Sequence, residues 1–408
     1  MRDRFSLAVV GAGASGLAAA ISAARRGASA VLLERLPRAG RKLLATGGGR
    51  CNLLNEALSA SAFTSTDPSL VGSVLGRFGP AEIRSLFEGL GLRLQADVSG
   101  RVYPVTNQAA SVLRVLELET ARLKVTIKTG FEVDGIASEA GRFIVRARDG
   151  REVEASAVVL AGGGLSYPAL GSNGSCLELA AAFGHRVVAP VPSAVPLCVK
   201  DRMCHLLQGQ RMRVRVEGQI DGRPAGSAEG EFLFTRYGIS GTAVLDVSEG
   251  LSVALNREGR RDVAVVVDFL PFMTAEEASG EFLRRSAAGW APGELVTGLL
   301  PEKFARVLAR GIPAPGRPPV DNKDAQGTRG LAAALKAWKF PVQGTRGWNE
   351  AEFTAGGVDA SEVRIGTLES RLRPGLYLAG EVLDVQGGRG GFNLGWAWAS
   401  GFVAGLGG

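Results

Sequence analysis

Histidine and cysteine are scarce in this chain of 408 residues, which contains two histidines and four cysteines. The cysteines stand at positions 51, 176, 198 and 204 without a CxxC pair, so we expect no disulfide framework and a reducing, cytoplasmic location. Cys198, Cys204 and His205 match no common zinc spacing, and His185 is the only other imidazole, so we expect no metal site. The same scarcity argues against a Ser-His-Asp hydrolase.

Dense clusters of Lys and Arg are also missing, although the formal net charge is +7 and the pI is about 9.5. We therefore expect no nucleic-acid partner, and attribute the positive charge to solubility and attraction for anionic small molecules. The run RMRVRV at 211–216 alternates and predicts a strand with one solvated face.

A basic start and the uncharged run from Ser6 to Ala24 resemble a signal peptide. A glycine motif explains these positions better, and we expect no membrane segment.

Glycine, in contrast, is abundant with 57 residues, and its first cluster is GAGASG. Gly11, Gly13 and Gly16 form GxGxxG between the strand-like SLAVV and the helix-like ASGLAAAISAARRG. The next strand, ASAVLLE, ends in Glu34, where a Rossmann unit has its ribose-binding acid. Gly11 permits the turn, Gly13 admits a pyrophosphate and Gly16 permits close helix packing, while the helix N-terminus attracts phosphate. The pattern predicts a dinucleotide-binding βαβ unit without identifying the dinucleotide.

The far end of the chain favours FAD over NAD. Short strands are predicted over 123–161 and end in ASAVVLAGGG, and GLYLAGE is another apolar strand, which stops at Gly380 and Glu381. GGRGGFNLGWAWASG then leads into an apolar helix. In FAD enzymes of this fold, such a Gly-acid pair lies at the ribityl chain, and the following helix N-terminus stabilises negative charge on the reduced ring.

The stretch TGGGRCN at 46–52 is interpreted as a flavin-binding loop. Its glycines remove Cβ atoms that would block a flat ring or a pyrophosphate. Arg50 supplies positive charge for phosphate or flavin oxygens, and Asn52 can donate or accept a hydrogen bond at the ring edge. Cys51 is either a redox-active thiol, with its pKa lowered by Arg50, or a packing residue. We expect packing, since no second cysteine is close in sequence.

Other candidate side chains have two interpretations each. Tyr167 follows a cofactor strand and is either a proton donor facing the flavin or a packing residue with a satisfied hydroxyl, which we favour. Arg389 either meets an anionic substrate or covers its own loop, and the sequence does not decide between these. Trp396 and Trp398 lie on an apolar helix, where we expect core residues and not a stacking platform. We assign no catalytic side chain, because the flavin can perform the redox step.

Seven segments carry a resemblance to a known family: GAGASGLAAA, TGGGRCNLLN, GRVYPVTNQAASVL, AGGGLSYPALGSNG, FLFTRYGISGTAVLDVS, AEFTAGGV and GLYLAGEVLDVQGGRGGFNLGWAWASG. Together they resemble bacterial FAD-dependent flavoproteins of the aminoacetone oxidase and 3-dehydro-bile-acid reductase type, over almost the whole chain. Family members commonly read GSTGDGY where this chain has GSNGSCLEL from Gly171. Ser175 and Cys176 therefore leave the geometry of that loop open.

The resemblance implies an α/β fold in which a Rossmann-type FAD-binding domain is built from both chain ends, with an inserted β-barrel domain and a small helical domain. Strand-like segments after residue 190 and a capping box from Thr274 to Glu277 support this division. We place the FAD-binding domain at 1–190 and 356–408, the β-barrel substrate domain at 191–270 and 337–355, and the helical domain at 271–336. We expect the inserted segment, including Arg236 and Tyr237, to determine substrate specificity.

The residues expected to bind FAD come from both chain ends. They are Gly11, Gly13, Ala14, Ser15, Gly16, Glu34, Arg35, Lys42, Thr46, Gly47, Gly48, Gly49, Arg50, Cys51, Asn52, Val133, Ala161, Gly162, Gly163, Gly380, Glu381, Asn393 and Leu394.

The expected function is that of an FAD-dependent oxidoreductase acting on a small organic substrate through flavin hydride transfer. A single GxGxxG leaves no separate NAD(P)H domain. Either NAD(P)H docks transiently to reduce the flavin, or an amine substrate does so and oxygen reoxidises it. The alternative is an FAD-dependent RNA-modifying enzyme or a flavin-binding protein without activity, and the lack of Lys and Arg clusters counts against RNA. The oligomeric state is left open.

Overall fold

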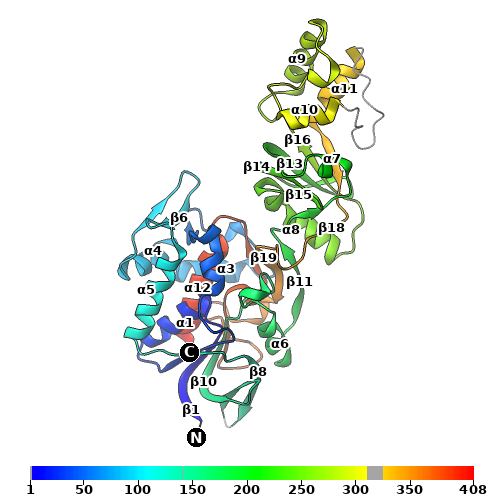
Figure 1. Ribbon diagram of the computed structural model, residues 1–408. Helices are drawn as coiled ribbons and strands as arrows, with labels where there is room; N and C mark the ends of the chain where they lie inside the picture. Colours follow the sequence, from blue (N-terminus) through cyan, green and yellow to red (C-terminus); the bar gives the residue numbers. More distant parts are fainter. Residues whose placement is uncertain (1, 140, 310–324) are drawn as a thin grey trace. The chain divides into compact units, whose positions relative to one another are not determined.

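The computed structural model describes residues 2–139, 141–309 and 325–408 (Figure 1). The chain forms two compact units. The first consists of Met1–Pro190 and Phe353–Gly408, and the second of Val191–Glu352. The first unit is therefore built from both ends of the chain. The finer division of the insert at residues 270 and 337 stays a prediction, and its helical part includes 310–324, which lie outside the described residues.

A parallel sheet forms the centre of the first unit, with strand order β7-β2-β1-β10 and β20 paired to β10. Its strands are β1 (Asp3–Val10), β2 (Ala30–Glu34), β7 (Thr126–Thr129), β10 (Glu152–Leu160) and β20 (Leu376–Leu378). Leu7–Val10, β2 and β20 are buried along their whole length, as expected for parallel strands covered on both faces. The pairing of β20 with β10 brings the C-terminal segment into the cofactor domain.

The strand β10 changes partners along one edge. Because β1 pairs along its other edge, β9 (Arg142–Ala147) and β20 share the remaining one. β9 pairs antiparallel with Glu152–Ala155, and β20 pairs parallel with Val158–Leu160. β8 (Val133–Glu139) extends the antiparallel part. The pairing along this edge thus changes from antiparallel to parallel near residue 156. The parallel strands β1 and β10 end at the glycine-rich segments that follow them.

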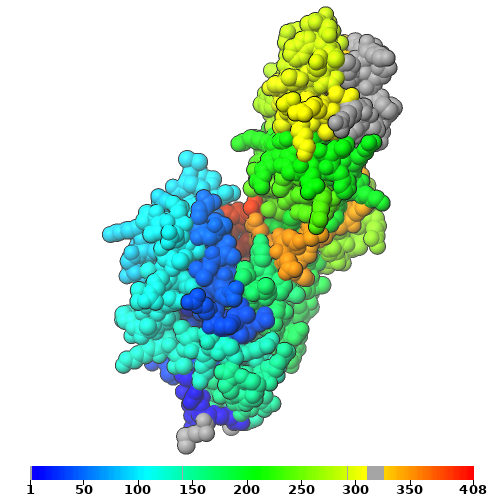
Figure 2. Space-filling view, in the orientation of Figure 1, coloured from blue at the N-terminus to red at the C-terminus, as the bar shows by residue number. Residues whose placement is uncertain are grey.

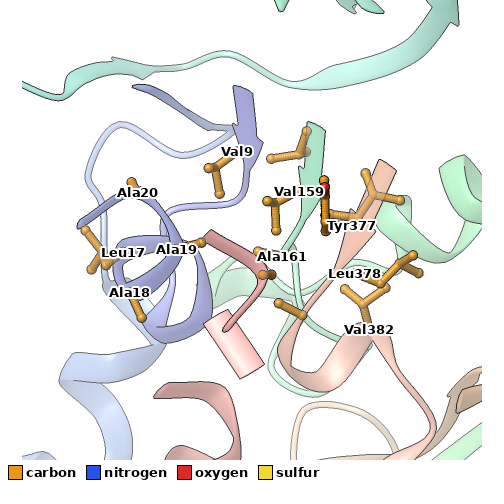
Figure 3. Packing of buried hydrophobic residues seen from close by; sticks show 14 of the residues in the cluster. Val9, Leu17, Ala18, Ala19, Ala20, Val159, Ala161, Tyr377, Leu378 and Val382 are labelled. Atoms are coloured by element: carbon orange, nitrogen blue, oxygen red, sulfur yellow. The ribbon is translucent and has the colours of Figure 1, made fainter. Parts of the chain in front are cut away.

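Two helices from opposite ends of the chain pack through small residues. α1 (Ala14–Arg25) follows β1, and α12 (Phe392–Gly407) is the C-terminal helix. A Cβ on Gly401 would lie 2.2 Å from the Ser15 carbonyl oxygen, and one on Gly405 would lie 2.2 Å from that of Ala19. Figure 3 shows α1, with Leu17–Ala20 labelled, beside the strands that carry Val9 and Val159. On the face drawn in Figure 2, the red C-terminal segment is almost entirely covered.

Trp396 and Trp398 belong to this core, with 1% and 0% of their surfaces exposed. Their indole N–H groups donate to the carbonyl oxygens of Gly380 and Leu53, each at 3.1 Å. The expectation that both are core residues is confirmed.

The other helices and strands of the first unit and its connections are α2 (Arg41–Ala45), β3 (Leu54–Asn55), β4 (Phe63–Ser65), α3 (Pro68–Arg77), α4 (Pro80–Gly89), β5 (Leu94–Ala96), β6 (Arg101–Pro104), α5 (Ala109–Arg122), α6 (Ser175–Ala182), β11 (Val187–Ser193), β19 (Phe353–Val358) and β21 (Val385–Gly387).

The second unit contains a closed sheet with strand order β17-β16-β13-β14-β15-β12-β18. These strands are β12 (Leu197–Cys198), β13 (Arg211–Ile220), β14 (Arg223–Thr235), β15 (Gly238–Ser240), β16 (Val263–Asp268), β17 (Trp338–Pro341) and β18 (Gly344–Thr345). The two outermost strands, β17 and β18, are joined by two residues. Val342 N–H donates to Val263 O at 2.8 Å, and Gln343 N–H donates to Cys198 O at 2.9 Å. One continuous segment therefore closes the barrel.

Helices complete the second unit: α7 (Arg202–Leu206), α8 (Thr242–Asn256), α9 (Ala275–Ala287), α10 (Glu302–Ala309) and α11 (Ala325–Lys336). The predicted capping box at the start of α9 is confirmed. Glu277 N–H donates to Thr274 Oγ1 at 3.1 Å, and Thr274 N–H donates to Glu277 Oε2 at 2.7 Å. The sequence RMRVRV lies in β13, as predicted. Its three arginines pair with two glutamates of the neighbouring β14, which offset most of their charge.

Candidate functional site

The turn between β1 and α1 contains three glycines, and contacts within the protein require glycine at only two of these positions. A Cβ on Gly11, whose φ is +102°, would lie 2.6 Å from Ala161 O, and a Cβ on Gly16 would lie 1.9 Å from Gly11 O. Gly13 has a φ of −82°, which any residue adopts, and no described atom lies within 4 Å of its Cβ position. The backbone at Gly13 is thus open to a ligand. α1 begins there without a side-chain cap, so the N–H groups of Ala14 and Ser15 face no helical partner.

Glu34 ends β2 beside this turn and is 8% exposed. Its Oε2 accepts the Ala12 N–H and its Oε1 accepts the Leu36 N–H, both at 2.9 Å. A carboxylate offers about four acceptor sites, so each oxygen retains capacity for a hydroxyl group. The geometry therefore fits the predicted role of Glu34 as the ribose ligand.

The segment that follows β10 lies against the same turn. Ala161 N–H donates to Val10 O at 2.9 Å. A Cβ on Gly162 would lie 2.5 Å from Cys176 Sγ, and one on Gly163 would lie 2.8 Å from Ser172 Oγ. Burial raises the pKa of Cys176 to about 12, so its thiol is a neutral packing group. Despite the unusual Ser175 and Cys176, this loop still leads into helix α6, which starts at Ser175.

Lys42 and Glu381 come from opposite ends of the chain and form an ion pair, with Nζ 2.7 Å from Oε2. Lys42 Nζ also donates to Ser166 Oγ at 2.7 Å, and the Ser166 hydroxyl donates to Glu381 Oε1 at 3.2 Å. Thr354 N–H donates to the same oxygen at 2.8 Å. The Lys42 and Glu381 side chains are 25% and 22% exposed, so the network lies at an accessible edge of the first unit.

Sequence reasoning selected Lys42 and Glu381 separately and missed the two residues that join them to the loop after β10. Ser166 and Thr354 stand in the segments AGGGLSYP and AEFTAGGV, which the sequence marks only as motifs of the resembled family. Gly380, beside Glu381, also packs tightly, since a Cβ on it would lie 2.6 Å from Ser15 Oγ. The end of β20 therefore lies at the start of α1, where phosphates are expected.

The loop TGGGRCN exposes bare backbone. Thr46–Gly49 form a short turn in which Gly47, Gly48 and Gly49 have φ values of +58°, +65° and +87°. These three glycines are exposed, and no described atom lies within 4 Å of the Cβ positions of Gly48 and Gly49. Three consecutive left-handed residues require glycine, and the absence of side chains leaves room for a flat ring.

Cys51 lies under this loop and is completely buried. Burial raises the pKa of its thiol to about 12, against a smaller lowering by a hydrogen bond with Thr46. A thiol that stays protonated is a poor nucleophile. The structure therefore favours the packing interpretation of Cys51 over the redox one.

Arg50 and Asn52 border the loop on either side of Cys51. The Arg50 guanidinium lies over the Tyr103 ring, 5.1 Å from its centroid, and Nε donates to Gly47 O at 3.2 Å. Asn52 Oδ1 is buried and has no hydrogen-bond partner among the described residues. An unsatisfied buried acceptor costs about 1–3 kcal/mol, which fits a ligand that brings a donor to this position.

The start of α12 meets the same loop. Gly391, with a φ of +101°, caps the helix without a side chain, and its Cβ position lies 2.8 Å from Asn52 Oδ1. The Asn393 side chain binds its own loop, accepting from Gly387 N–H at 2.9 Å and donating to Gly387 O at 2.7 Å. What Asn393 and Leu394 offer a ligand is therefore the backbone N–H groups at the positive end of the helix.

Arg35 follows Glu34 in the chain, and Val133 begins β8. Arg35 Nη1 donates to Gly171 O at 3.3 Å, and the Cβ position of Gly171 lies 3.9 Å from Glu34 Oε1. Val133 lines a cavity of about 570 Å³ together with Asn173 and with residues of β8 and α6. We call Gly11–Gly16, Glu34 and Val133 the adenosine side, and Thr46–Asn52 with the start of α12 the flavin side.

These two sides fit FAD. The adenosine side offers open backbone at Gly13 and a carboxylate at Glu34, and the flavin side offers bare backbone and an acceptor without a donor at Asn52. Contact of each predicted residue with FAD stays a prediction. Across the described ranges, His, Cys, Asp and Glu side chains form no group of three able to hold a metal ion. No described helix combines the length and apolarity needed to cross a bilayer.

Comparison with known proteins places the chain in a family. The HI0933-like protein Rossmann domain matches residues 5–407. A 3-dehydro-bile acid delta(4,6)-reductase from Clostridium scindens is 40% identical over 404 residues, covering 98% of each chain. Ribosomal RNA dihydrouridine synthases from Escherichia coli and Haemophilus influenzae are each 30% identical, and the alignments cover 98% of this chain and 96% and 97% of theirs.

Solved structures share the fold at low sequence identity. The open form of a flavocytochrome c3 fumarate reductase has a TM-score of 0.52 and 16% identity, covering 99% of this chain and 78% of that one. A 3-ketosteroid delta1-dehydrogenase from Sterolibacterium denitrificans has a TM-score of 0.51 and 14% identity, covering 99% of both. The expected fold class, FAD cofactor and oxidoreductase class are confirmed. The chain belongs to the HI0933-like family of Rossmann-domain flavoproteins and is an FAD-dependent oxidoreductase.

Proposed function

We propose that the protein is a reductase that passes two electrons from NAD(P)H, through FAD, to a carbon–carbon double bond conjugated to a carbonyl group in a small organic substrate. The observation that carries this proposal is the 40% identity, across 98% of both chains, with a 3-dehydro-bile acid delta(4,6)-reductase. That name describes reduction of double bonds at positions 4 and 6 beside a 3-oxo group. Dihydrouridine synthesis likewise reduces a double bond conjugated to a carbonyl, so relatives of both kinds have one reaction type.

The direction of electron flow supports NAD(P)H over oxygen as the redox partner. Both relatives' names denote reduction of a substrate, which requires a donor to the flavin. The sequence contains a single GxGxxG, at Gly11–Gly16, and we assign it to FAD. NAD(P)H would therefore dock transiently, without a Rossmann domain of its own.

Residues of the first unit then have distinct tasks. Glu34 and the N-terminus of α1 hold the ribose and the phosphates. The start of α12 offers unpaired N–H groups, and its positive end stabilises negative charge beside it. The Lys42–Glu381 pair fixes the end of β20 relative to the loop after β10. When bound, FAD supplies the hydride-transfer chemistry itself.

Anaerobic mixing tests this proposal. The FAD-loaded protein is mixed with NADPH or NADH, and the loss of flavin absorbance is followed. A conjugated enone such as 2-cyclohexenone, or a 3-oxo steroid with a 4,5 double bond, is then added. We expect NAD(P)H to bleach the flavin, and the enone to restore its colour with formation of the saturated ketone. Bleaching by aminoacetone, with reoxidation only by oxygen, would contradict the proposal and indicate an amine oxidase.

Reduction of uridine in ribosomal RNA is a second candidate, favoured by the two dihydrouridine synthases at 30% identity. The net charge of +7 suits an RNA substrate. The arginines of β13 add little to this, because Arg211, Arg213 and Arg215 share the two carboxylates of Glu231 and Glu229. Incubating the reduced protein with ribosomal RNA and measuring dihydrouridine by mass spectrometry tests this candidate. A strong salt dependence of RNA binding should accompany a positive result.

A further inference from the structure

The proposed reduction needs a proton as well as a hydride, and this subsection rests on that proposed function. When a hydride adds to the β-carbon of a conjugated double bond, the electron pair of that bond moves toward the α-carbon and the carbonyl. A proton must then arrive at the α-carbon to give the saturated product. A positioned acid contributes about 10²–10⁴-fold to such a step.

Most of the side chains that could donate this proton are buried or already hydrogen-bonded to other groups. The Cys51 thiol has no exposed surface, and burial raises its pKa to about 12. Lys42 is engaged with the carboxylate of Glu381 and with a serine hydroxyl. His185 has both ring nitrogens within hydrogen-bond distance, 2.8 and 2.7 Å, of side chains in the first unit.

Tyr103 on β6 is different, because its hydroxyl is uncommitted and lies at the flavin side of the site. The residue is 8% exposed. Its Cε1, adjacent to the carbon that bears the hydroxyl, lies 3.8 Å from the Cβ position of Gly47. The hydroxyl has no hydrogen-bond partner among the described residues, and its oxygen is not among the described buried polar atoms that lack a partner. The hydroxyl is therefore open to a ligand on the bare backbone of Gly47–Gly49.

Arg50 completes this arrangement. Its guanidinium lies 5.1 Å from the centroid of the Tyr103 ring, a contact that favours one orientation of the ring. This contact thus holds the Tyr103 ring beside the bare backbone of the loop, where Cε1 lies 3.8 Å from the Cβ position of Gly47.

We propose that Tyr103 is the proton donor in the reduction of the conjugated double bond. Its O–H bond breaks as the C–H bond forms at the α-carbon, and water returns a proton to the phenolate before the next turnover. Each turnover consumes one enone, one NAD(P)H and one proton, and yields the saturated carbonyl compound and NAD(P)+. The hydride and the tyrosine proton supply the two hydrogens gained by the substrate.

The test is Tyr103→Phe in the FAD-loaded protein. Phenylalanine keeps the ring beneath Arg50 and removes only the hydroxyl. Anaerobic stopped-flow separates flavin reduction by NAD(P)H from reoxidation by 2-cyclohexenone. We expect the first rate and the FAD content to stay within about twofold, and the second rate to fall about 10²–10³-fold. Binding of the saturated ketone, followed by the flavin absorbance spectrum, should weaken about two- to tenfold through loss of one hydrogen bond.

Tyr377→Phe is the matched control, because that hydroxyl donates to Gly407 O at 2.6 Å, at the other end of α12. It should leave both rates unchanged. Equal reoxidation rates in wild type and Tyr103→Phe would overturn the proton-donor role of Tyr103 and leave the proposed function standing. Slow reoxidation in Tyr167→Phe, with a normal rate in Tyr103→Phe, would have the same consequence. Loss of FAD or slow flavin reduction in Tyr103→Phe would show a structural role instead. A wild-type protein whose reduced flavin no enone reoxidises would overturn the proposed function itself.

Discussion

The two glycine-rich segments of the site, the turn Gly11–Gly16 and the loop Gly47–Gly49, require glycine for different reasons. In the turn, Cβ atoms on Gly11 and Gly16 would meet backbone atoms at 2.6 and 1.9 Å, so the packing of strand against helix excludes any side chain. In the loop, Gly48 and Gly49 have free space around their Cβ positions, and only their positive φ values require glycine. The turn is thus part of the folded core, whereas the loop is an exposed surface shaped for a ligand.

This difference separates stability from binding. A substitution of Gly11 or Gly16 must move β1 or α1, which are buried at the centre of the first unit. A substitution in the loop changes the backbone conformation of an exposed segment and leaves the core packing unchanged. Variants of Gly11 and Gly16 should therefore fold poorly, and loop variants should fold normally and bind FAD less tightly.

Gly16→Ala should have the largest effect. Its new Cβ would lie 1.9 Å from the backbone oxygen of Gly11. Overpacking costs about 1–3 kcal/mol and occasionally more, and we expect a loss of about 3 kcal/mol or more in the free energy of unfolding. Urea unfolding of the apoprotein and the FAD content on purification measure this. Gly76→Ala in α3 is the control, because its Cβ position is free and alanine favours helix. If Gly16→Ala were as stable as the wild type, the turn would not differ from the loop in its importance for the folded core.

Glu34→Ala should act on FAD binding, with the next largest effect. The change removes the charged acceptor offered to the ribose hydroxyls, a loss of about 1.5–3 kcal/mol, or about ten- to a hundredfold in affinity. It also removes the acceptor of the Ala12 and Leu36 N–H groups. Glu34→Gln, which retains one acceptor oxygen and the shape of the side chain, should weaken binding less. Titration of apoprotein with FAD gives both values, and an unchanged dissociation constant would show that Glu34 does not bind the ribose.

How much of the site the sequence predicts depends on how far apart the partners stand in the chain. The glycine turn and Glu34 lie within one βαβ unit, where spacing and periodicity determine the geometry. The Lys42–Glu381 pair joins residues 339 positions apart. No local pattern links the two, because their contact depends on the pairing of β20 with β10. The fold class was accessible because apolar strands and cofactor motifs mark both chain ends.

The environment of Arg50 shows the same limit. That its guanidinium meets phosphate or flavin oxygens stays a prediction, and its position over the Tyr103 ring could not be read from the sequence. The two residues lie on different strands and loops, and only the tertiary fold brings β6 beneath the loop. Trp396 and Trp398, in contrast, were predictable as core residues, since a helix that is apolar all round is normally buried.

Gly48→Ala should separate binding from stability most clearly. The Cβ meets nothing within 4 Å, but the φ of +65° becomes unfavourable, by about 1–2 kcal/mol for a left-handed residue. We expect this cost to lower the FAD affinity about 5- to 30-fold. The free energy of unfolding of the apoprotein should stay unchanged. Gly48→Asn should have a smaller effect, because asparagine tolerates this conformation. A drop in apoprotein stability as large as that of Gly16→Ala would show that the loop belongs to the core after all.

The smallest effect concerns the Cys51 thiol beneath the loop, and it should be seen only at alkaline pH. Burial raises the pKa of this thiol from 9.0 to about 12. The folded protein therefore holds the proton more tightly than the unfolded chain. The resulting stability is fully present below about pH 9 and is lost as the pH rises toward 12, by up to about 1.4 kcal/mol per pH unit.

Comparing Cys51→Ala with wild type isolates this contribution. Cys176 and Cys204, whose pKa values are also raised by burial, affect both proteins equally and cancel. We expect the free energy of unfolding to fall between pH 8 and pH 10 by about 1 kcal/mol less in Cys51→Ala, whatever the cost of the substitution at pH 8. In the native protein at pH 8, Cys51 should also resist thiol reagents. Rapid labelling of Cys51 there would require an accessible thiolate and would favour the redox interpretation, making the loop a reactive surface and not only a binding one.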